Sequence, residues 1–190
     1  MVVNGIFEIV EGCLLSVRYE GHEKDEFERI FDLWKEDVEF LEKFFENHKN
    51  DLQSGHFGIV SVENAVSKTL EEAAEFESHI FKVAEKGVNN LDETLDVRIF
   101  SPLHKNETST KLIESKAYGR AERSWLRLYA IRIGNHKYLV TGGAIKLTRT
   151  MQDRLHTREE LEKLKTVSKY LKEQDIMDDD DFYFIDITTK

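Results

Sequence analysis

The spacing of apolar side chains changes near Val97, and this change limits the folds that the chain can adopt. From residue 24 to residue 86, large apolar side chains recur at every third or fourth position, a spacing that predicts amphipathic helices. After Val97, apolar and polar residues alternate, which predicts strands. A run of helices followed by a run of strands favours an α+β fold.

Two helices are predicted in the first part of the chain. One covers residues 24–48 and carries a stripe of aromatic side chains, and the other starts near Ser61, a suitable N-cap, and ends before Gly87. A pair of strands within residues 6–19 precedes them. We therefore expect residues 24–86 to form an acidic antiparallel helical hairpin that is inserted after the first strands.

The clearest strand signal covers residues 125–145. Residues 125–133 alternate in pattern, and Gly134-Asn135 supplies a tight turn into a second strand at residues 137–145. Shorter or edge strands are expected at residues 100–103 and 111–118. The sequence thus predicts an antiparallel sheet of four to six strands with this hairpin at its centre.

Three further features are predicted around and after this hairpin. Gly142-Gly143 inside a strand indicates a bulge or the close approach of another backbone. Thr157 and Glu160 have the spacing of a capping box, which predicts a C-terminal helix. Beyond four consecutive aspartates, residues 182–187 are expected to add a strand.

The net charge of −10 conceals three segments of different character. Residues 1–97 contain 9 Lys and Arg against 23 Asp and Glu, residues 98–172 contain 17 against 7, and residues 173–190 contain 1 against 7. A basic segment inside an acidic chain favours the binding of a polyanion, most often a nucleic acid. The alternative is that these cations pair with the chain's own carboxylates.

Length and composition favour a single domain of residues 1–190 whose basic sheet and helix core lies at residues 97–172. The single cysteine, Cys13, lies in an apolar run and is interpreted as a buried thiol in a reducing compartment. Neither a signal peptide nor a run of roughly 18 apolar residues is present, so a cytoplasmic protein with no membrane partner is expected. The histidines lack metal-ligand spacing, so neither a metal nor a cofactor is expected.

Candidate site residues lie on the predicted hairpin and just after it. The strand period places Arg127 and Tyr129 on one face, where the cation can bind phosphate and the ring can stack on a base. More cations follow at Arg132, Lys137, Lys146, Arg149 and Arg154, and His156 is the nearby group that titrates near neutrality.

Residues 111–171 resemble the RelE/HigB-type toxins, which are small ribonucleases. Residues 128–132, Leu-Tyr-Ala-Ile-Arg, match the leucine-aromatic-x-leucine-arginine strand of that family, and residues 144–150 match its basic exit before the last helix. Arg132 and Lys146 are the two positions that match the family's functional residues.

The chain departs from this family pattern at three positions. Ala130 stands where the family commonly has an acidic residue, Leu147 where it has a second lysine, and Met151 where it has a proline. These departures affect the residues needed for cleavage more than those needed for the fold.

The resemblance implies a RelE-like fold and the toxin of a toxin–antitoxin pair. Such a toxin is an mRNA endoribonuclease that acts on free mRNA or on the ribosome, and its antitoxin partner is expected to be a helix-turn-helix protein. Cleavage by 2′-hydroxyl attack needs a base, an acid and cations, but no metal. The predicted catalytic residues are Arg132, Lys146 and His156, and the predicted substrate-binding residues are Arg127, Tyr129, Lys137, Arg149 and Arg154.

A rival hypothesis from another class also fits the sequence. It is a non-catalytic binding protein of the same fold, which uses its basic sheet face for RNA or for an acidic protein partner. Cleavage products would distinguish the enzyme from the binding protein.

Overall fold

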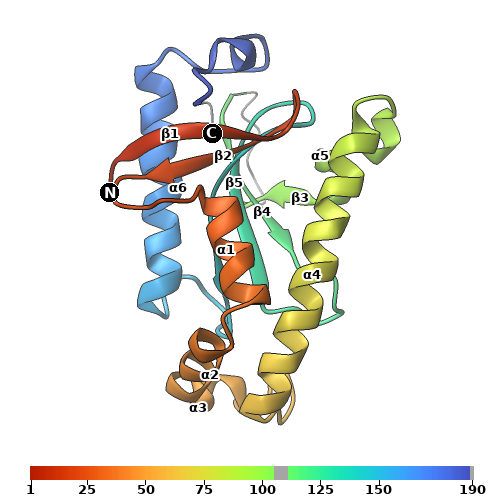
Figure 1. The fold of residues 1–190 in the computed structure, drawn as a ribbon, viewed down its shortest axis with the longest axis vertical. Helices are drawn as coiled ribbons and strands as arrows, with labels where there is room; N and C mark the ends of the chain where they lie inside the picture. Colours follow the sequence, from red (N-terminus) through yellow and green to blue (C-terminus); the bar gives the residue numbers. More distant parts are fainter. Residues whose placement is uncertain (105–110, 189–190) are drawn as a thin grey trace.

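The computed structural model describes residues 1–104 and 111–188, which fold into a six-stranded sheet between two layers of helices (Figure 1). The strand order is β1-β2-β6-β5-β4-β3. The strands are β1 (Val3–Val10), β2 (Leu14–Tyr19), β3 (Phe100–Pro102), β4 (Ile113–Tyr118), β5 (Leu126–Gly134) and β6 (Lys137–Ile145). The helices are α1 (Glu26–Lys35), α2 (Val38–Asn47), α3 (Lys49–Leu52), α4 (Val62–Gly87), α5 (Leu95–Arg98) and α6 (Leu155–Glu173), with 3₁₀ helices η1 (Leu91–Glu93) and η2 (Asp180–Phe184). The predicted α+β fold is confirmed.

The β5–β6 hairpin lies at the centre of the sheet, as the alternating pattern predicted. Gly134 pairs with Lys137, so the two residues of the turn are Asn135 and His136. The predicted turn, Gly134-Asn135, is therefore displaced by one residue.

His136 adopts the left-handed conformation that glycine usually supplies at such a turn, with φ at 62°. Its buried ring is held by two hydrogen bonds. The Leu95 N–H donates to Nδ1 over 2.9 Å, and Nε2 lies 2.9 Å from the carbonyl oxygen of Ala84. These bonds offset a backbone cost of about 1–2 kcal/mol, which explains why a side chain other than glycine occupies the position.

The Gly142-Gly143 pair marks the bulge that the sequence predicted. The register between β5 and β6 shifts immediately after Tyr129, so β6 contains one extra residue at this point. A side chain on Gly142 would collide with the carboxylate of Glu160. Close approach of α6 therefore requires glycine here.

Strand β5 is buried on both faces. Leu128 and Ala130 belong to the apolar core shared with α1, α2 and α4, whereas Tyr129 and Ile131 belong to the core shared with α6. The alternation along β5 thus separates two cores instead of a core and solvent.

Residues 24–86 cover one face of the sheet, where α1 packs on α4 and on β6 (Figure 1). The single helix predicted for residues 24–48 is wrong, because the chain forms α1, α2 and α3 there. Asp37 ends the first of these helices and caps the next. Its carboxylate accepts a hydrogen bond from the Phe40 N–H over 2.8 Å, an arrangement that begins a new helix.

The second predicted helix is confirmed as α4. Its N-cap is Ser61, whose hydroxyl accepts a hydrogen bond from the Asn64 N–H over 3.2 Å. Within residues 1–104 and 111–188, no helix is both long and apolar enough to cross a membrane.

The N-terminal hairpin of β1 and β2 is also confirmed, and it joins the sheet through β2. Strand β2 runs parallel to β6, with Leu15 paired with Leu139. The other strand pairs are antiparallel, so the sheet is mixed and not purely antiparallel. The parallel pair arises because the chain crosses the sheet between β2 and β6.

The predicted capping box at the start of α6 is wrong. The helix begins at Leu155, two residues before Thr157, whose hydroxyl donates to the Met151 carbonyl oxygen over 2.6 Å. Glu160 is 5% exposed and points into the protein, where it cannot cap the helix. The hydrophobic packing of α6 on β5 and β6 determines where the helix starts.

The strand predicted for residues 182–187 is wrong as well. The chain forms η2 there, and Phe182 packs into the core beneath α6. Thr188, the last described residue, contacts β1, where its N–H donates to the Ile6 carbonyl oxygen over 2.7 Å.

A buried ion cluster joins α6 to α1. The Lys163 ammonium donates to Glu26 over 2.7 Å and to Glu160 over 2.8 Å, and Arg29 donates to both oxygens of Glu26. One Glu160 oxygen has no hydrogen-bond partner among the described residues. Desolvation raises the pKa of Glu160 to about 7, although Lys163 opposes this shift.

We expect Glu160→Gln to stabilise the protein increasingly as the pH rises. The folded-state pKa of Glu160 lies above its ordinary value of 4.5, so the glutamate disfavours folding progressively as the pH rises from about 4.5 through 7. The neutral glutamine lacks this penalty. The difference in unfolding free energy between variant and wild type should grow by about 1–3 kcal/mol from pH 5 to pH 8 in urea titrations.

Glu162→Gln, at an exposed position on the same helix, serves as the control. A difference that does not change with pH would contradict this prediction.

Candidate functional site

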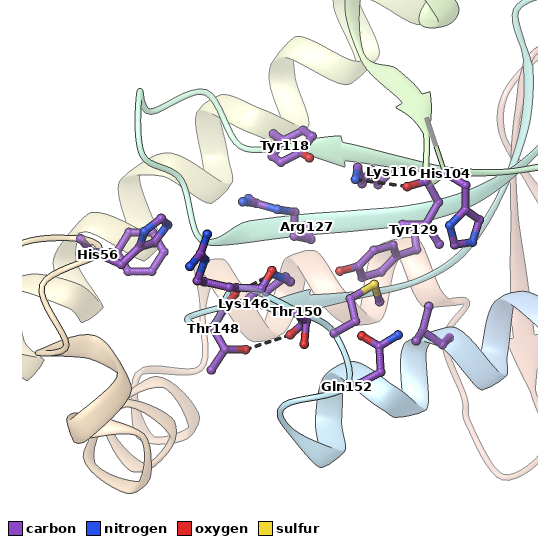
Figure 2. A pocket seen from close by; sticks show the side chains of 15 residues that line it. His56, His104, Lys116, Tyr118, Arg127, Tyr129, Lys146, Thr148, Thr150 and Gln152 are labelled. Atoms are coloured by element: carbon purple, nitrogen blue, oxygen red, sulfur yellow. Dashed lines mark hydrogen bonds between the residues drawn. The ribbon is translucent and has the colours of Figure 1, made fainter. Parts of the chain in front are cut away.

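A cavity of about 470 Å³ opens on the sheet where β5 begins (Figure 2). Its walls come from β4, β5 and the segment that follows β6. It is lined by the cations Lys116, Arg127, Lys146 and Arg149, by Phe57, Tyr118 and Tyr129, by His56 and His104, and by Leu103, Thr148, Thr150, Met151, Gln152 and Leu161. None of these lining residues is Asp or Glu, so the described wall is positive in a chain of net charge −10.

Strand pairing brings four of these side chains together. Lys116 pairs with Tyr129, and Tyr118 pairs with Arg127, across β4 and β5. Residues two apart on a strand point to the same face, so both cations and both rings face the cavity, as Figure 2 shows.

Arg127 is the most informative residue of the cavity. Its Nη1 donates to the carbonyl oxygens of Ser124 over 2.9 Å and Leu126 over 2.7 Å, and its guanidinium lies 4.1 Å from the ring centroid of Tyr118. No described carboxylate forms an ion pair with it. Desolvation lowers the pKa of Arg127, so the structure holds a partly buried cation without a paired anion.

Lys146 shapes the wall that faces Arg127. Its ammonium donates to the carbonyl oxygens of Thr148 over 2.6 Å and Arg149 over 2.7 Å, which fixes the turn after β6. Desolvation and the nearby charges of Arg127 and Lys116 lower the pKa of Lys146. An anion bound between these cations would relieve their mutual repulsion.

The two tyrosines of the cavity differ in exposure. Tyr129, predicted to stack on a base, is only 1% exposed, and its burial raises the pKa of its hydroxyl. Tyr118 is 47% exposed and therefore offers more ring surface to a ligand. The ring that a ligand can reach is therefore that of Tyr118 on β4, and not that of Tyr129 on β5 as predicted.

Two histidines also line the cavity, at the two ends of the row of side chains in Figure 2. His56 packs edge-on against Phe57 with ring centroids 4.7 Å apart, and the Nε2 of His104 lies 3.7 Å from a carboxylate oxygen of Glu114. Sequence spacing pointed to neither histidine, because they follow elements that are distant along the chain.

The structure brings together four of the predicted site residues and separates the others. Arg127, Tyr129, Lys146 and Arg149 line the cavity. Arg132 lies near the far end of β5 on the opposite face, with its Nε 2.5 Å from an oxygen of Asp96. The predicted grouping of Arg132 with Lys146 is therefore wrong.

Three more predicted residues have partners outside the cavity. Lys137 lies 3.2 Å from Asp179, and Arg154 donates to both oxygens of Asp51 over 2.5 and 2.6 Å. His156 packs against the ring of Phe44, and its Nε2 lies 3.0 Å from a backbone carbonyl oxygen. Desolvation lowers the pKa of His156, which keeps the ring neutral near pH 7.

Charge pairing within the chain thus accounts for one part of the basic segment and not for another. Arg132, Lys137, Arg154 and Lys163 have carboxylate partners, as the internal-pairing alternative predicted. The cations that line the cavity form no ion pair with a described carboxylate. Among the described residues, the predicted site cations therefore divide into a group with carboxylate partners and a group without them, Arg127, Lys146 and Arg149, that lines the cavity.

Comparison with known proteins supplies no relative from which a function could be transferred. No protein-family model, no curated protein and no solved structure matches the chain. The resemblance of residues 111–171 to the RelE/HigB-type toxins stays a hypothesis, and the chemistry of the cavity is the basis for a functional assignment.

Proposed function

We propose that the protein binds single-stranded RNA in the cavity beside Arg127. The observation that carries this proposal is that Arg127 is partly desolvated, lacks a described carboxylate partner and faces a cavity with three other cations. Burying a charge without a counterion disfavours folding, and a bound anion would offset this desolvation penalty. A phosphate group would supply that counterion.

The remaining wall suits the other parts of a nucleotide. The exposed ring of Tyr118 can stack on a base, and Thr148, Thr150 and Gln152 offer polar groups to a ribose hydroxyl. A concave site with an aromatic floor admits an unpaired base more readily than a duplex. This combination favours RNA over an acidic protein partner, which would need no stacking surface.

Binding should weaken by tenfold or more in Arg127→Met, measured by fluorescence anisotropy with a labelled single-stranded RNA of about ten nucleotides. Each phosphate neutralised contributes about −0.7 to the slope of log K against log salt, so the wild type should show a slope of about −2 to −3. The melting temperature should change little, because the variant loses two hydrogen bonds but also loses a desolvated charge. A DNA oligomer of the same sequence tests the preference for ribose.

Arg132→Met is the matched control for this experiment. It removes the same group from the same strand, but on the opposite face, and Asp96 keeps hydrogen bonds from Tyr138 and His136. We expect its RNA affinity to stay within about twofold of the wild type. Equal losses in the two variants, or a wild type without RNA affinity, would contradict the proposal.

A second candidate function, RNA cleavage, is favoured by one specific observation. Lys146 has a lowered pKa and shares the cavity with His56 and His104, so groups able to accept and donate protons surround the proposed phosphate site. In this reaction the 2′-oxygen attacks phosphorus while a base takes its proton, and an acid protonates the departing 5′-oxygen. The products are a 2′,3′-cyclic phosphate and a 5′-hydroxyl.

This candidate retains the toxin hypothesis with different catalytic residues. Its substrate is mRNA, free or on the ribosome, and its expected partner is a helix-turn-helix antitoxin in the cytoplasm. Arg132 and His156 lie outside the cavity, so His56 and His104 would replace them beside Lys146, which keeps its predicted role.

If the protein cleaves RNA, His104→Ala should reduce the rate by about 10²–10⁴, while Arg132→Ala should leave it unchanged. The assay is a denaturing gel of labelled RNA incubated with EDTA, with and without ribosomes. A single 2′-deoxynucleotide at the cleaved position should block the reaction. Intact RNA in every arm, together with retained affinity, would eliminate cleavage and leave the binding protein.

A further inference from the structure

A second cavity adjoins the first, and Arg127 lines both of them. The second cavity has a volume of about 570 Å³ and shares His56, Phe57, Tyr118 and Arg127 with the first cavity. Its own wall is the connection from β4 to β5, including Glu122, Arg123 and Ser124. These four shared residues, Arg127 among them, therefore form a partition between two neighbouring cavities.

The wall of the second cavity is held in place by specific contacts. Glu72 of α4 is 5% exposed and accepts a hydrogen bond from the Ala121 N–H over 3.1 Å. A side chain on Gly119 would collide with Glu72 and with Ser124. The connection is thus fixed against α4 before any ligand arrives, which lowers the entropic cost of binding.

Arg127 also fixes this wall while keeping donors for a ligand. Its two internal hydrogen bonds both use Nη1, and one of them holds the carbonyl oxygen of Ser124. An arginine has five N–H donors in a planar fork, so Nε and Nη2 remain without a hydrogen-bond partner among the described residues. Such a fork matches two oxygens of one phosphate.

We infer that the RNA site spans both cavities, with the phosphodiester between two adjacent nucleotides held by Arg127 at the partition and one nucleoside on each side. This inference rests on the proposed RNA binding and adds that the ligand is an extended strand and not a mononucleotide. Arg123, exposed on the wall of the second cavity, is placed to meet the strand as it continues. Glu122 makes this cavity less positive than the first, which suits a base with amino groups better than a second phosphate.

The test compares uridine 3′-monophosphate with a uridine tetranucleotide by isothermal titration calorimetry. The tetranucleotide should bind at least about tenfold more tightly, because only it occupies both cavities. Arg123→Glu should remove most of this gain and leave mononucleotide affinity unchanged. Arg120→Glu is the matched control, since Arg120 lies on the same connection but lines a different cavity with His79 and Lys82.

Two results would overturn the inference in distinguishable ways. Equal affinities for the two ligands, both insensitive to Arg123→Glu, would show that the site ends at Arg127 while RNA binding stands. Absence of binding by either ligand would remove the proposed function and this inference together. Melting curves of both loop variants verify that each is folded.

Discussion

The pairing of β5 with β6 determines where the charged side chains of the basic segment lie. Both strands are central and largely buried, so their register cannot slip without moving apolar side chains out of the two cores. Charged side chains of the hairpin lie only where it leaves these cores. One such place is beside the turn, where Arg132 and Lys137 lie, and the other is the open end, where Arg127 and Lys146 lie.

The cations at the two ends of the hairpin have different kinds of partner. Beside the turn, carboxylates of α5 and of the acidic C-terminal segment neutralise Arg132 and Lys137. At the open end, backbone carbonyl oxygens hold Arg127 and Lys146, which fixes their geometry without neutralising their charge. A cation fixed by neutral acceptors is ready for an anionic ligand, whereas one paired with a carboxylate must first lose its partner. This contrast separates the candidate site from the rest of the basic segment.

The sequence predicted the elements better than the positions of single side chains. The hairpin and α4 follow from long, regular patterns, whereas the break at Asp37 and the η2 turn depend on local capping and tertiary packing. Arg127 and Arg132 are five residues apart on one strand, about 16 Å, and the strand period itself places them on opposite faces. Grouping them as one site therefore conflicted with the geometry of a strand.

The residues missed in the site show where sequence patterns fail. Lys116 and Tyr118 face the cavity because β4 pairs with β5 in one register, and that register depends on contacts between segments. His56 and His104 reach the same cavity from two loops that are 48 positions apart in the sequence. Periodicity within one element cannot reveal such a meeting, although the Lys-x-Tyr alternation on β4 offered a signal that matched Arg-x-Tyr on β5.

The parallel pairing of β2 with β6 has a consequence for the way the chain folds. Leu14 pairs with Tyr138, so nearly three quarters of the 190-residue sequence must be synthesised before β2 can pair with β6. Contacts of such long sequence separation slow folding, and during synthesis the N-terminal hairpin has only an incomplete sheet to join. Until β6 emerges, the edge of β2 is unpaired and able to associate with other chains. Pairing of β6 with β2 thus completes the sheet and also ends the stage of synthesis at which the nascent protein is most prone to aggregate.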